Sequence, residues 1–161
     1  MQETIIALPA IKLVGISCRT NNLAEMGPAT AQIGKTIQEY SSLLEQMGKD
    51  KNTSITYCVY TDYASDYQGD YTYFIGKVAA DFEQVSLGLE TCFIPAQAYV
   101  KFTTETGKMP QVCVDMWQEI WKMSPNELGG SRAYLADFEI YDERAIDPQH
   151  TILDIYIGIK Q

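Results

Sequence analysis

Two carboxylates, Glu139 and Asp154, lie in apolar, β-prone segments, and each is followed two residues later by a tyrosine, Tyr141 or Tyr156. In a β-strand, residues i and i+2 share one face of the sheet, so each carboxylate would stand beside an aromatic ring. A carboxylate is costly to bury without a positive partner, and aromatic rings attract cations. These pairs therefore predict a site that binds a small cation.

Other aromatic residues could complete the walls of this site. Tyr60 and Phe74 lie in β-prone runs, where alternation assigns them to the same face as the carboxylates. Trp117 and Trp121 recur at helical spacing, which fits the core as well as a pocket wall, and Tyr99 is equally open between the two. The candidate ligand-binding residues are therefore Glu139, Tyr141, Asp154, Tyr156, Trp117, Trp121, Tyr60, Phe74 and Tyr99.

Other site chemistry finds little support in the sequence. The one histidine, His150, lies in a proline-containing turn, away from any serine or cysteine motif. The cysteines are widely spaced and form no C-x-x-C pair: Cys18, Cys58, Cys92 and Cys113. No glycine-rich nucleotide-binding motif occurs. We therefore expect no metal and no cofactor, and we expect the cysteines to be structural or incidental.

The charge of the chain restricts its partners. A formal net charge of -9 and a pI of about 4.5 oppose direct binding to nucleic acid, which needs clustered basic residues to neutralise phosphates. The first residues show no basic start followed by an apolar block, and no apolar run approaches membrane-spanning length. We therefore expect a cytoplasmic protein that binds neither nucleic acid nor membrane directly.

Periodicity indicates the elements that position the candidate residues. Segments 8–16 and 94–102 each contain a proline near the start and continue as β-prone runs. Pro28 fits the first turn of a helix that would end at Gly48, with an apolar stripe formed by Ile33, Ile37, Tyr40, Leu44 and Met47. Pro110 precedes a second helix, with a stripe formed by Cys113, Met116, Trp117, Ile120 and Trp121.

The order of elements repeats along the chain. Each helix is followed by two β-rich runs that fit a hairpin, at 55–62 and 71–78 and again at 133–142 and 151–159. The pattern predicts one α+β domain over residues 1–161, built from duplicated βαββ units with pseudo-two-fold symmetry: copy one at about 8–78 and copy two at about 94–159. An antiparallel sheet flanked by two helices would leave a ligand cleft between the copies.

Alternation within the strands predicts which side chains the helices cover. We expect the apolar set to lie beneath the helices: Phe138, Ile140, Leu153, Ile155, Ile157, Val59 and Ile75. The opposite set would then face away from the helices: Glu139, Tyr141, Asp154, Tyr156, Tyr60, Phe74 and Cys58. An antiparallel sheet can also simply leave one face in water, so this face is either a binding surface or an ordinary solvated one.

These segments together resemble the GyrI-like effector-binding family. The resemblance is carried by Leu8–Ala10, the WQEIW helix, and the strands FEIY (138–141) and DIYI (154–157), and it covers nearly the whole chain. The family includes drug-binding domains of MerR-type and AraC-type regulators, gyrase-inhibitor-like proteins and stand-alone binders of the integron-cassette type, which this acidic chain most resembles. No helix-turn-helix pattern accompanies the domain in this sequence, so we expect an effector or drug-binding protein without its own DNA-binding domain.

The resemblance implies that the ligand is a small lipophilic molecule, cationic and aromatic, and it implies roles for individual residues. In drug-sensing members a carboxylate on the strand after the second helix neutralises the ligand, and Glu139 matches it; Asp154 and Tyr156 would be a second acidic residue and a tyrosine on the last strand. Two alternatives stay open. Glu139 could act as a general base, as in relatives that hydrolyse small molecules, or the chain could be a gyrase-inhibitor-like interaction module or bind a regulatory protein partner.

Overall fold

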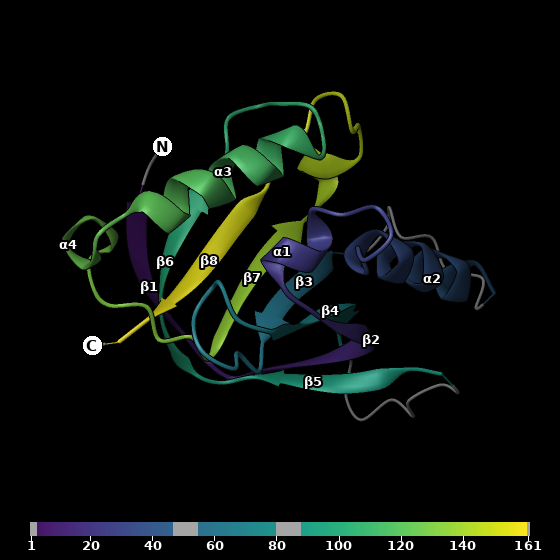
Figure 1. Cartoon of the computed structure of the whole chain (residues 1–161), viewed down its shortest axis with the longest axis horizontal. Coiled ribbons are helices and arrows are strands. Elements are labelled where there is room, and N and C mark those ends of the chain that lie inside the picture. The colour runs from purple at the N-terminus through teal and green to yellow at the C-terminus, as the bar shows by residue number, and fades with distance from the viewer. Residues whose placement is uncertain (1–2, 47–54, 80–87, 161) are drawn as a thin grey trace.

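Runs of β-branched and aromatic residues form the strands of one eight-stranded antiparallel sheet (Figure 1). The computed structural model describes residues 3–46, 55–79 and 88–160. The strands are β1 (Glu3–Leu8), β2 (Ile11–Thr20), β3 (Thr56–Thr61), β4 (Tyr71–Val78), β5 (Glu90–Ile94), β6 (Gln97–Thr103), β7 (Ala136–Tyr141) and β8 (Asp154–Ile159). With the helices described below, this sheet confirms the predicted α+β class.

Prolines divide two of the predicted strands. Pro9 lies between β1 and β2, and Pro95 lies between β5 and β6. Proline has no N–H to donate to a neighbouring strand, so a continuous strand ends at each of these positions. The sequence interpretation placed one strand near each proline and missed β1 and β5, which form the two edges of the sheet.

The sheet order, β1-β6-β8-β7-β3-β4-β2-β5, reads equivalently from its two ends. β6, β8 and β7 occupy the places that β2, β4 and β3 occupy in the other half. The two edge strands pair with the opposite half of the sheet. β1, which precedes β2 in the chain, pairs with β6, and β5, which precedes β6, pairs with β2. This order is the one that a duplicated unit predicts, and superposition of residues 8–78 on 94–159 by about a half turn stays a prediction.

Both predicted long helices are present. α2 (Ile33–Gln46) buries Tyr40 and Leu44 against the sheet, and α3 (Gln111–Lys122) buries Trp117 and Ile120. Pro110 directly precedes α3, as expected. The described residues also contain two short helices, α1 (Asn22–Glu25) and α4 (Pro125–Leu128), and a 3-10 turn at Glu143–Ala145.

α2 begins later than the sequence suggested. Pro28 lies five residues before Ile33, in the connection from α1. The carboxylate of Glu25 accepts hydrogen bonds from the backbone N–H groups of Gln32 and Ile33, at 2.8 and 3.1 Å, and thereby caps the helix. The predicted end of this helix, Met47 and Gly48, lies outside the described residues.

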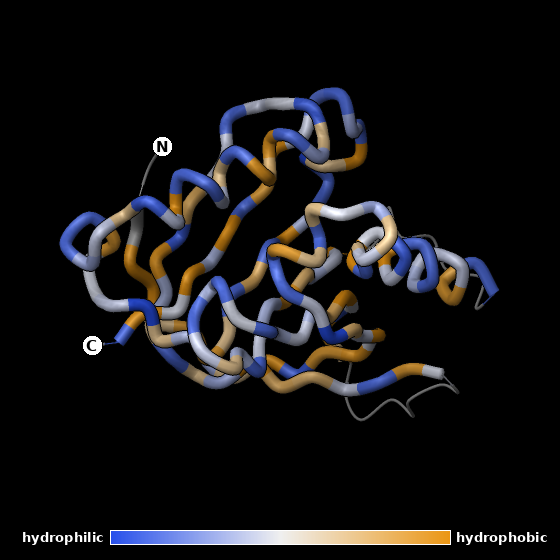
Figure 2. The backbone as a smooth tube through the Cα atoms, viewed as in Figure 1, coloured by the Kyte–Doolittle hydropathy of each residue, from blue (hydrophilic) through white to orange (hydrophobic). Residues whose placement is uncertain are grey.

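The sheet is buried on both faces. On one face, α3 packs over Phe102, Ile155 and Ile157, while α2 packs over Cys58, Tyr73 and Ile75. On the other face the sheet curls, so residues near its two edges meet in a third cluster that includes Leu13, Ile94, Tyr99, Phe138 and Tyr156. Figure 2 shows hydrophobic segments following the strands, whereas α2 and α3 alternate between hydrophobic and hydrophilic residues.

The predicted face assignment is wrong for the central strands β3 and β7. Glu139 is paired with Cys58 and Ile155 and therefore faces the helices, whereas Phe138, paired with Val59 and Tyr156, faces away from them. The reversed set is Glu139, Tyr141, Cys58 and Tyr60, which lie on the helix side, and Phe138, Ile140 and Val59, which lie on the other side. The sequence interpretation assumed that only helices bury the sheet. The curled face is as apolar as the helix-covered one, so an apolar side chain on β3 or β7 does not have to face the helices.

The remaining face assignments hold. Leu153, Ile155 and Ile157 pack with α3, Ile75 packs with α2, and Phe74 and Tyr156 face away. Within the described ranges, no helix has the length and apolar character needed to cross a membrane.

Candidate functional site

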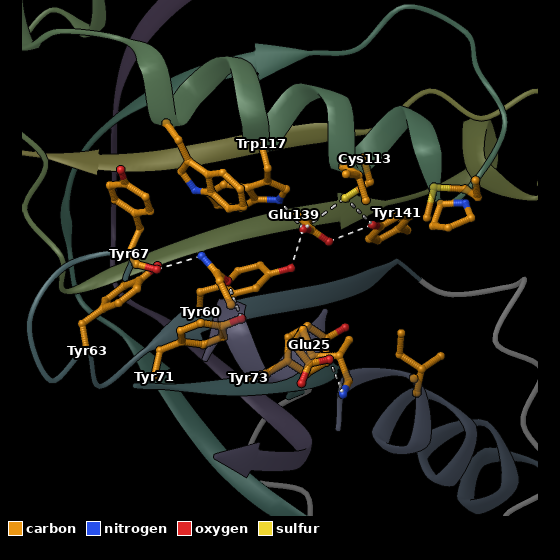
Figure 3. A pocket seen from close by; sticks show the side chains of 18 of the residues that line it. Glu25, Tyr60, Tyr63, Tyr67, Tyr71, Tyr73, Cys113, Trp117, Glu139 and Tyr141 are labelled. Carbon is orange, nitrogen blue, oxygen red and sulfur yellow. Dashed lines mark hydrogen bonds between the residues drawn. The ribbon is translucent and has the colours of Figure 1, made fainter. Parts of the chain in front are cut away.

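A cavity of about 370 Å³ opens between α2 and α3, above the middle of the sheet (Figure 3). Many of its wall residues are aromatic: Tyr60, Tyr63, Tyr67, Tyr71, Tyr73, Tyr141, Trp117 and Trp121. α3 supplies the tryptophans, β3, β4 and β7 supply tyrosines, and the β3–β4 connection supplies Tyr63 and Tyr67. A cavity of this size and composition is typical of a small-molecule site.

Glu139 lies at the centre of the upper wall and is only 2% exposed. Its Oε2 atom accepts hydrogen bonds from the indole N–H of Trp117 and the hydroxyl of Tyr60, both at 2.7 Å, and from the Cys113 thiol at 3.3 Å. Its Oε1 atom accepts one from the hydroxyl of Tyr141 at 2.7 Å. Four donors from α3, β3 and β7 therefore converge on one carboxylate.

All four of these donors are neutral, so the negative charge of Glu139 has no opposite charge beside it. Among the ion pairs between described residues, none includes Glu139. Hydrogen bonds to a carboxylate stabilise its ionised form, but they do not cancel its field. The cavity therefore has a negative potential in a mainly apolar space, which favours a ligand with positive charge.

Burial keeps the donors in their protonated forms. Desolvation, followed by the nearby charge of Glu139, raises the pKa of Tyr60, Tyr141 and the Cys113 thiol well above the ordinary values. Each group would have to ionise next to an existing negative charge. Cys113 is therefore a thiol and a hydrogen-bond donor, rather than a thiolate nucleophile.

Glu25 is a second carboxylate in the cavity wall, on the side of α1 and α2. Besides capping α2, it accepts a 2.5 Å hydrogen bond from the Thr20 hydroxyl. The positive end of the helix and these three donors compensate its charge locally. Glu25 therefore serves first to hold α2 in place, whereas Glu139 orients neutral side chains and has no helix end beside it to compensate its charge.

The aromatic rings contact one another across the two halves of the molecule. Tyr60 lies edge-on to Trp117, with ring centroids 5.0 Å apart, and also contacts Tyr73 at 5.4 Å. Tyr67 stacks on Trp121 with centroids 5.6 Å apart and planes 13° from parallel. These contacts fix the ring faces before any ligand arrives, which lowers the entropic cost of binding.

A buried ion pair closes one end of the cavity. Arg132 contacts Asp137 at 2.6 Å, and Asp137 also accepts hydrogen bonds from the Tyr63 hydroxyl at 2.6 Å and the backbone N–H of Gly158 at 2.8 Å. The guanidinium lies over the ring of Tyr134, 4.4 Å from its centroid. Because the pair is internally neutral, it leaves Glu139 as the dominant charge of the upper wall.

The structure brings together five of the nine predicted site residues. Glu139, Tyr141, Tyr60, Trp117 and Trp121 all line the cavity. The sequence left open whether the two tryptophans belong to the core or to the pocket wall. Trp117 belongs to both, and Trp121 lies mainly at the wall.

The other four predicted residues lie on the opposite face of the sheet: Asp154, Tyr156, Phe74 and Tyr99. Asp154 is held by Arg144 at 2.7 Å and Lys101 at 3.9 Å, so its charge is already compensated. Tyr156 stacks on Phe138 with centroids 4.7 Å apart. The implied correspondence of Asp154 and Tyr156 with pocket residues is therefore not supported by their position, because the strand register turns them away from the cavity.

Sequence reasoning missed several wall residues. Tyr71 and Tyr73 share a face of β4 that was assigned correctly for Ile75, so alternation could have identified both. Tyr63 and Tyr67 lie in a connection without periodicity, where only tyrosine density gave a signal. Glu25 lies in a four-residue helix that no pattern predicted.

Known proteins are similar to this chain over most of its length. A family model described as integron-associated effector binding protein (Cass2) matches residues 4–159. YobU of Bacillus subtilis (strain 168), named as a candidate transcriptional regulator, is 33% identical over 157 residues, covering 93% of this chain and 92% of its own.

Two solved structures are also similar. The integron cassette protein VCH_CASS2 of Vibrio cholerae is 28% identical, with a TM-score of 0.77 over 98% of this chain and 95% of its own. SAV2435, solved bound to tetraphenylphosphonium, is 15% identical with a TM-score of 0.68, covering 99% and 94% of the two chains, and shows the same fold.

Proposed function

Because the chain belongs to the Cass2 family of integron-associated effector-binding proteins, we propose that its ligands are lipophilic organic cations that bind in the cavity between α2 and α3. One observation carries this proposal. Glu139 is buried at 2% exposure, is surrounded by four neutral donors, and lacks an ionic partner among the described residues.

A cation in the cavity would relieve the cost of this arrangement. The carboxylate is already desolvated in the free protein, so a ligand that brings positive charge gains attraction without a further cost on the protein side. The faces of Tyr60, Trp117 and neighbouring rings add about 0.5–2 kcal/mol each where a cation contacts them. Flat apolar groups of the ligand gain from burial in the same aromatic walls.

Relatives support the same ligand class. SAV2435, which shares this fold, was solved with tetraphenylphosphonium, a lipophilic cation with four aromatic rings. We infer a similar chemistry here from the charge and the aromatic walls of the cavity. The name of YobU further supports a regulatory use of ligand binding, exerted through a partner protein rather than by direct contact of this acidic domain with DNA.

Calorimetric titration with a matched pair tests the proposal. Methyltriphenylphosphonium carries the charge, and triphenylphosphine oxide offers three similar rings without it. We expect the cation to bind more tightly by at least about tenfold, with quenching of tryptophan fluorescence. Equal affinities would mean that the cavity selects shape alone, and turnover of an aromatic ester of similar size, added in a separate assay, would favour a hydrolase.

A further inference from the structure

A second cavity of about 410 Å³ adjoins the first along α2. It lies between α2, which contributes Tyr40 and Ser41, the sheet, which contributes Cys58 and Ile75, and the segment after β7, which contributes Ala145 and Ile146. None of these six residues lines the first cavity. The two spaces are therefore separate compartments on the same face of the sheet.

The boundary between the compartments is formed by side chains that line both: Ile37, Tyr73, Met109 and Tyr141. The Tyr141 hydroxyl is 2.7 Å from Glu139, so the buried charge lies one hydrogen bond away from the wall of the second cavity. Met109 is half-buried, and an unbranched thioether side chain can change rotamer at low cost. A ligand held near Glu139 would reach the second space past these four side chains, and Met109 is the one that can move aside at lowest cost.

The second cavity suits a neutral apolar group. Among the described residues that line it, the acidic one is Asp142, which already pairs with Arg144 through two contacts of 2.9 Å and so offers no free charge to a second cation. Ile146, at its mouth, is 52% exposed, and Ile37, at the boundary, is 38% exposed. Hydrocarbon that covers these side chains would remove apolar surface from water.

From this juxtaposition we propose that the second cavity binds an extended apolar arm of the same ligand whose cationic group lies beside Glu139. The preferred ligands are then amphiphilic cations with one long arm, rather than compact cations or dications. This inference rests on the proposed function and adds the shape of the ligand to it.

Arm length gives a direct measurement. In an alkyltriphenylphosphonium series that extends from methyl to decyl, each added methylene buried in the second cavity should raise affinity about fourfold. The increase should stop when the cavity is full. Calorimetric titration of the wild-type protein gives the slope of affinity against arm length.

Two variants that fill the second cavity locate the arm. Ala145→Trp and Ser41→Phe add bulk from opposite walls of that space, and neither residue lines the first cavity. We expect both to bind the methyl compound as the wild-type protein does and to lose most of the gain from longer arms. Val114→Trp is the matched control, because Val114 lines only the first cavity and should weaken every member of the series alike.

The results separate the two proposals. A slope that is unchanged in both filling variants, or a flat slope in the wild-type protein, would overturn the assignment of the second cavity while leaving cation binding intact. No binding of the methyl compound by a folded wild-type protein would overturn the proposed function, and this inference with it. Normal circular dichroism and a normal unfolding midpoint establish that each variant is folded.

Discussion

Trp117 donates its indole N–H to the Glu139 carboxylate at 2.7 Å, so one of the two indole rings of the cavity wall is oriented by the residue that carries the charge of that wall. The same carboxylate fixes Tyr60 and Tyr141 through their hydroxyls. Charge and ring geometry are thus coupled, and a change at Glu139 affects both. The experiments below separate these two contributions.

Glu139→Gln should weaken cationic aromatic ligands by roughly 10- to 150-fold, as expected for loss of a charge-assisted contact worth about 1.5–3 kcal/mol. Neutral ligands of similar shape should change little, because Gln keeps nearly the same volume and the Tyr141 hydroxyl can rotate to accept from its amide. Titration calorimetry with the cation and neutral pair measures both effects. Glu119→Gln, which removes an exposed carboxylate on the far side of α3, is the control.

If Glu139 only shapes the pocket, the substitution would weaken both ligands equally. If its charge acts from a distance, the loss for the cation would shrink as salt is added. Only a large loss that is confined to the cation and persists at high salt agrees with direct neutralisation.

Trp117→Phe should lower the free energy of unfolding by about 1–3 kcal/mol, because it removes a donor from a buried carboxylate and leaves a void beside it. Trp121→Phe serves as the comparison, since Trp121 has no hydrogen bond to Glu139 and is less buried. Urea unfolding measures both. Equal losses in the two variants would show that packing, not the hydrogen bond, determines the effect.

Glu25→Ala should destabilise the protein by about 0.5–2 kcal/mol, through loss of the cap on α2. Its effect on cation affinity should be smaller than that of Glu139→Gln, since the charge of Glu25 is compensated by the helix end. The two quantities are measured by urea unfolding and by titration of the same sample. A larger affinity loss than Glu139→Gln produces would make Glu25 the principal counter-charge instead.

Alkaline pH should destabilise the fold. Burial and the charge of Glu139 raise the pKa of Tyr60, Tyr141 and Cys113 above their ordinary values of 10.0 for tyrosine and 9.0 for cysteine. A group whose pKa is higher in the folded protein contributes stability that is complete below the unfolded pKa and is lost as pH rises towards the folded pKa. The contribution should therefore be intact at about pH 7.5 and reduced at about pH 10.5.

Urea midpoints at these two pH values, together with the tyrosinate absorbance of the native protein, test this dependence. Buried tyrosines should ionise only as the protein unfolds, whereas exposed ones titrate first. A native protein in which all 11 tyrosines ionise near their ordinary pKa would contradict the burial of the donor network.

Duplex DNA should not bind measurably to this chain at moderate salt, because a net charge of -9 opposes phosphate contacts. Fluorescence anisotropy of a labelled duplex provides the measurement, with the salt concentration varied. Tight binding that weakens steeply with salt would require a basic surface that the composition does not provide.

The class of fold and both long helices could be predicted from the sequence, because they depend on strong local patterns. That Glu139 neutralises a ligand stays a prediction. The side of the sheet on which Glu139 lies could not be predicted, since both faces are buried and alternation shows only that β7 has two unlike faces. Asp154 resembled Glu139 in its local sequence, yet its partners Arg144 and Lys101 come from other segments. Tyr63 and Tyr67 reach the cavity through a loop whose path depends on tertiary contacts.

The exchange of edge strands makes the two halves of the domain mutually dependent. β1 precedes the first unit in the chain but completes the sheet of the second, and β5 does the reverse. The first half on its own would leave β2 without its partner β5, and the second half would leave β6 without β1. Each would then expose an unpaired strand edge that is prone to aggregation. The walls of the cavity come from both halves, so neither half alone can form the binding site. If the domain were split into two chains, both fragments would have to be present and assemble for the site to form.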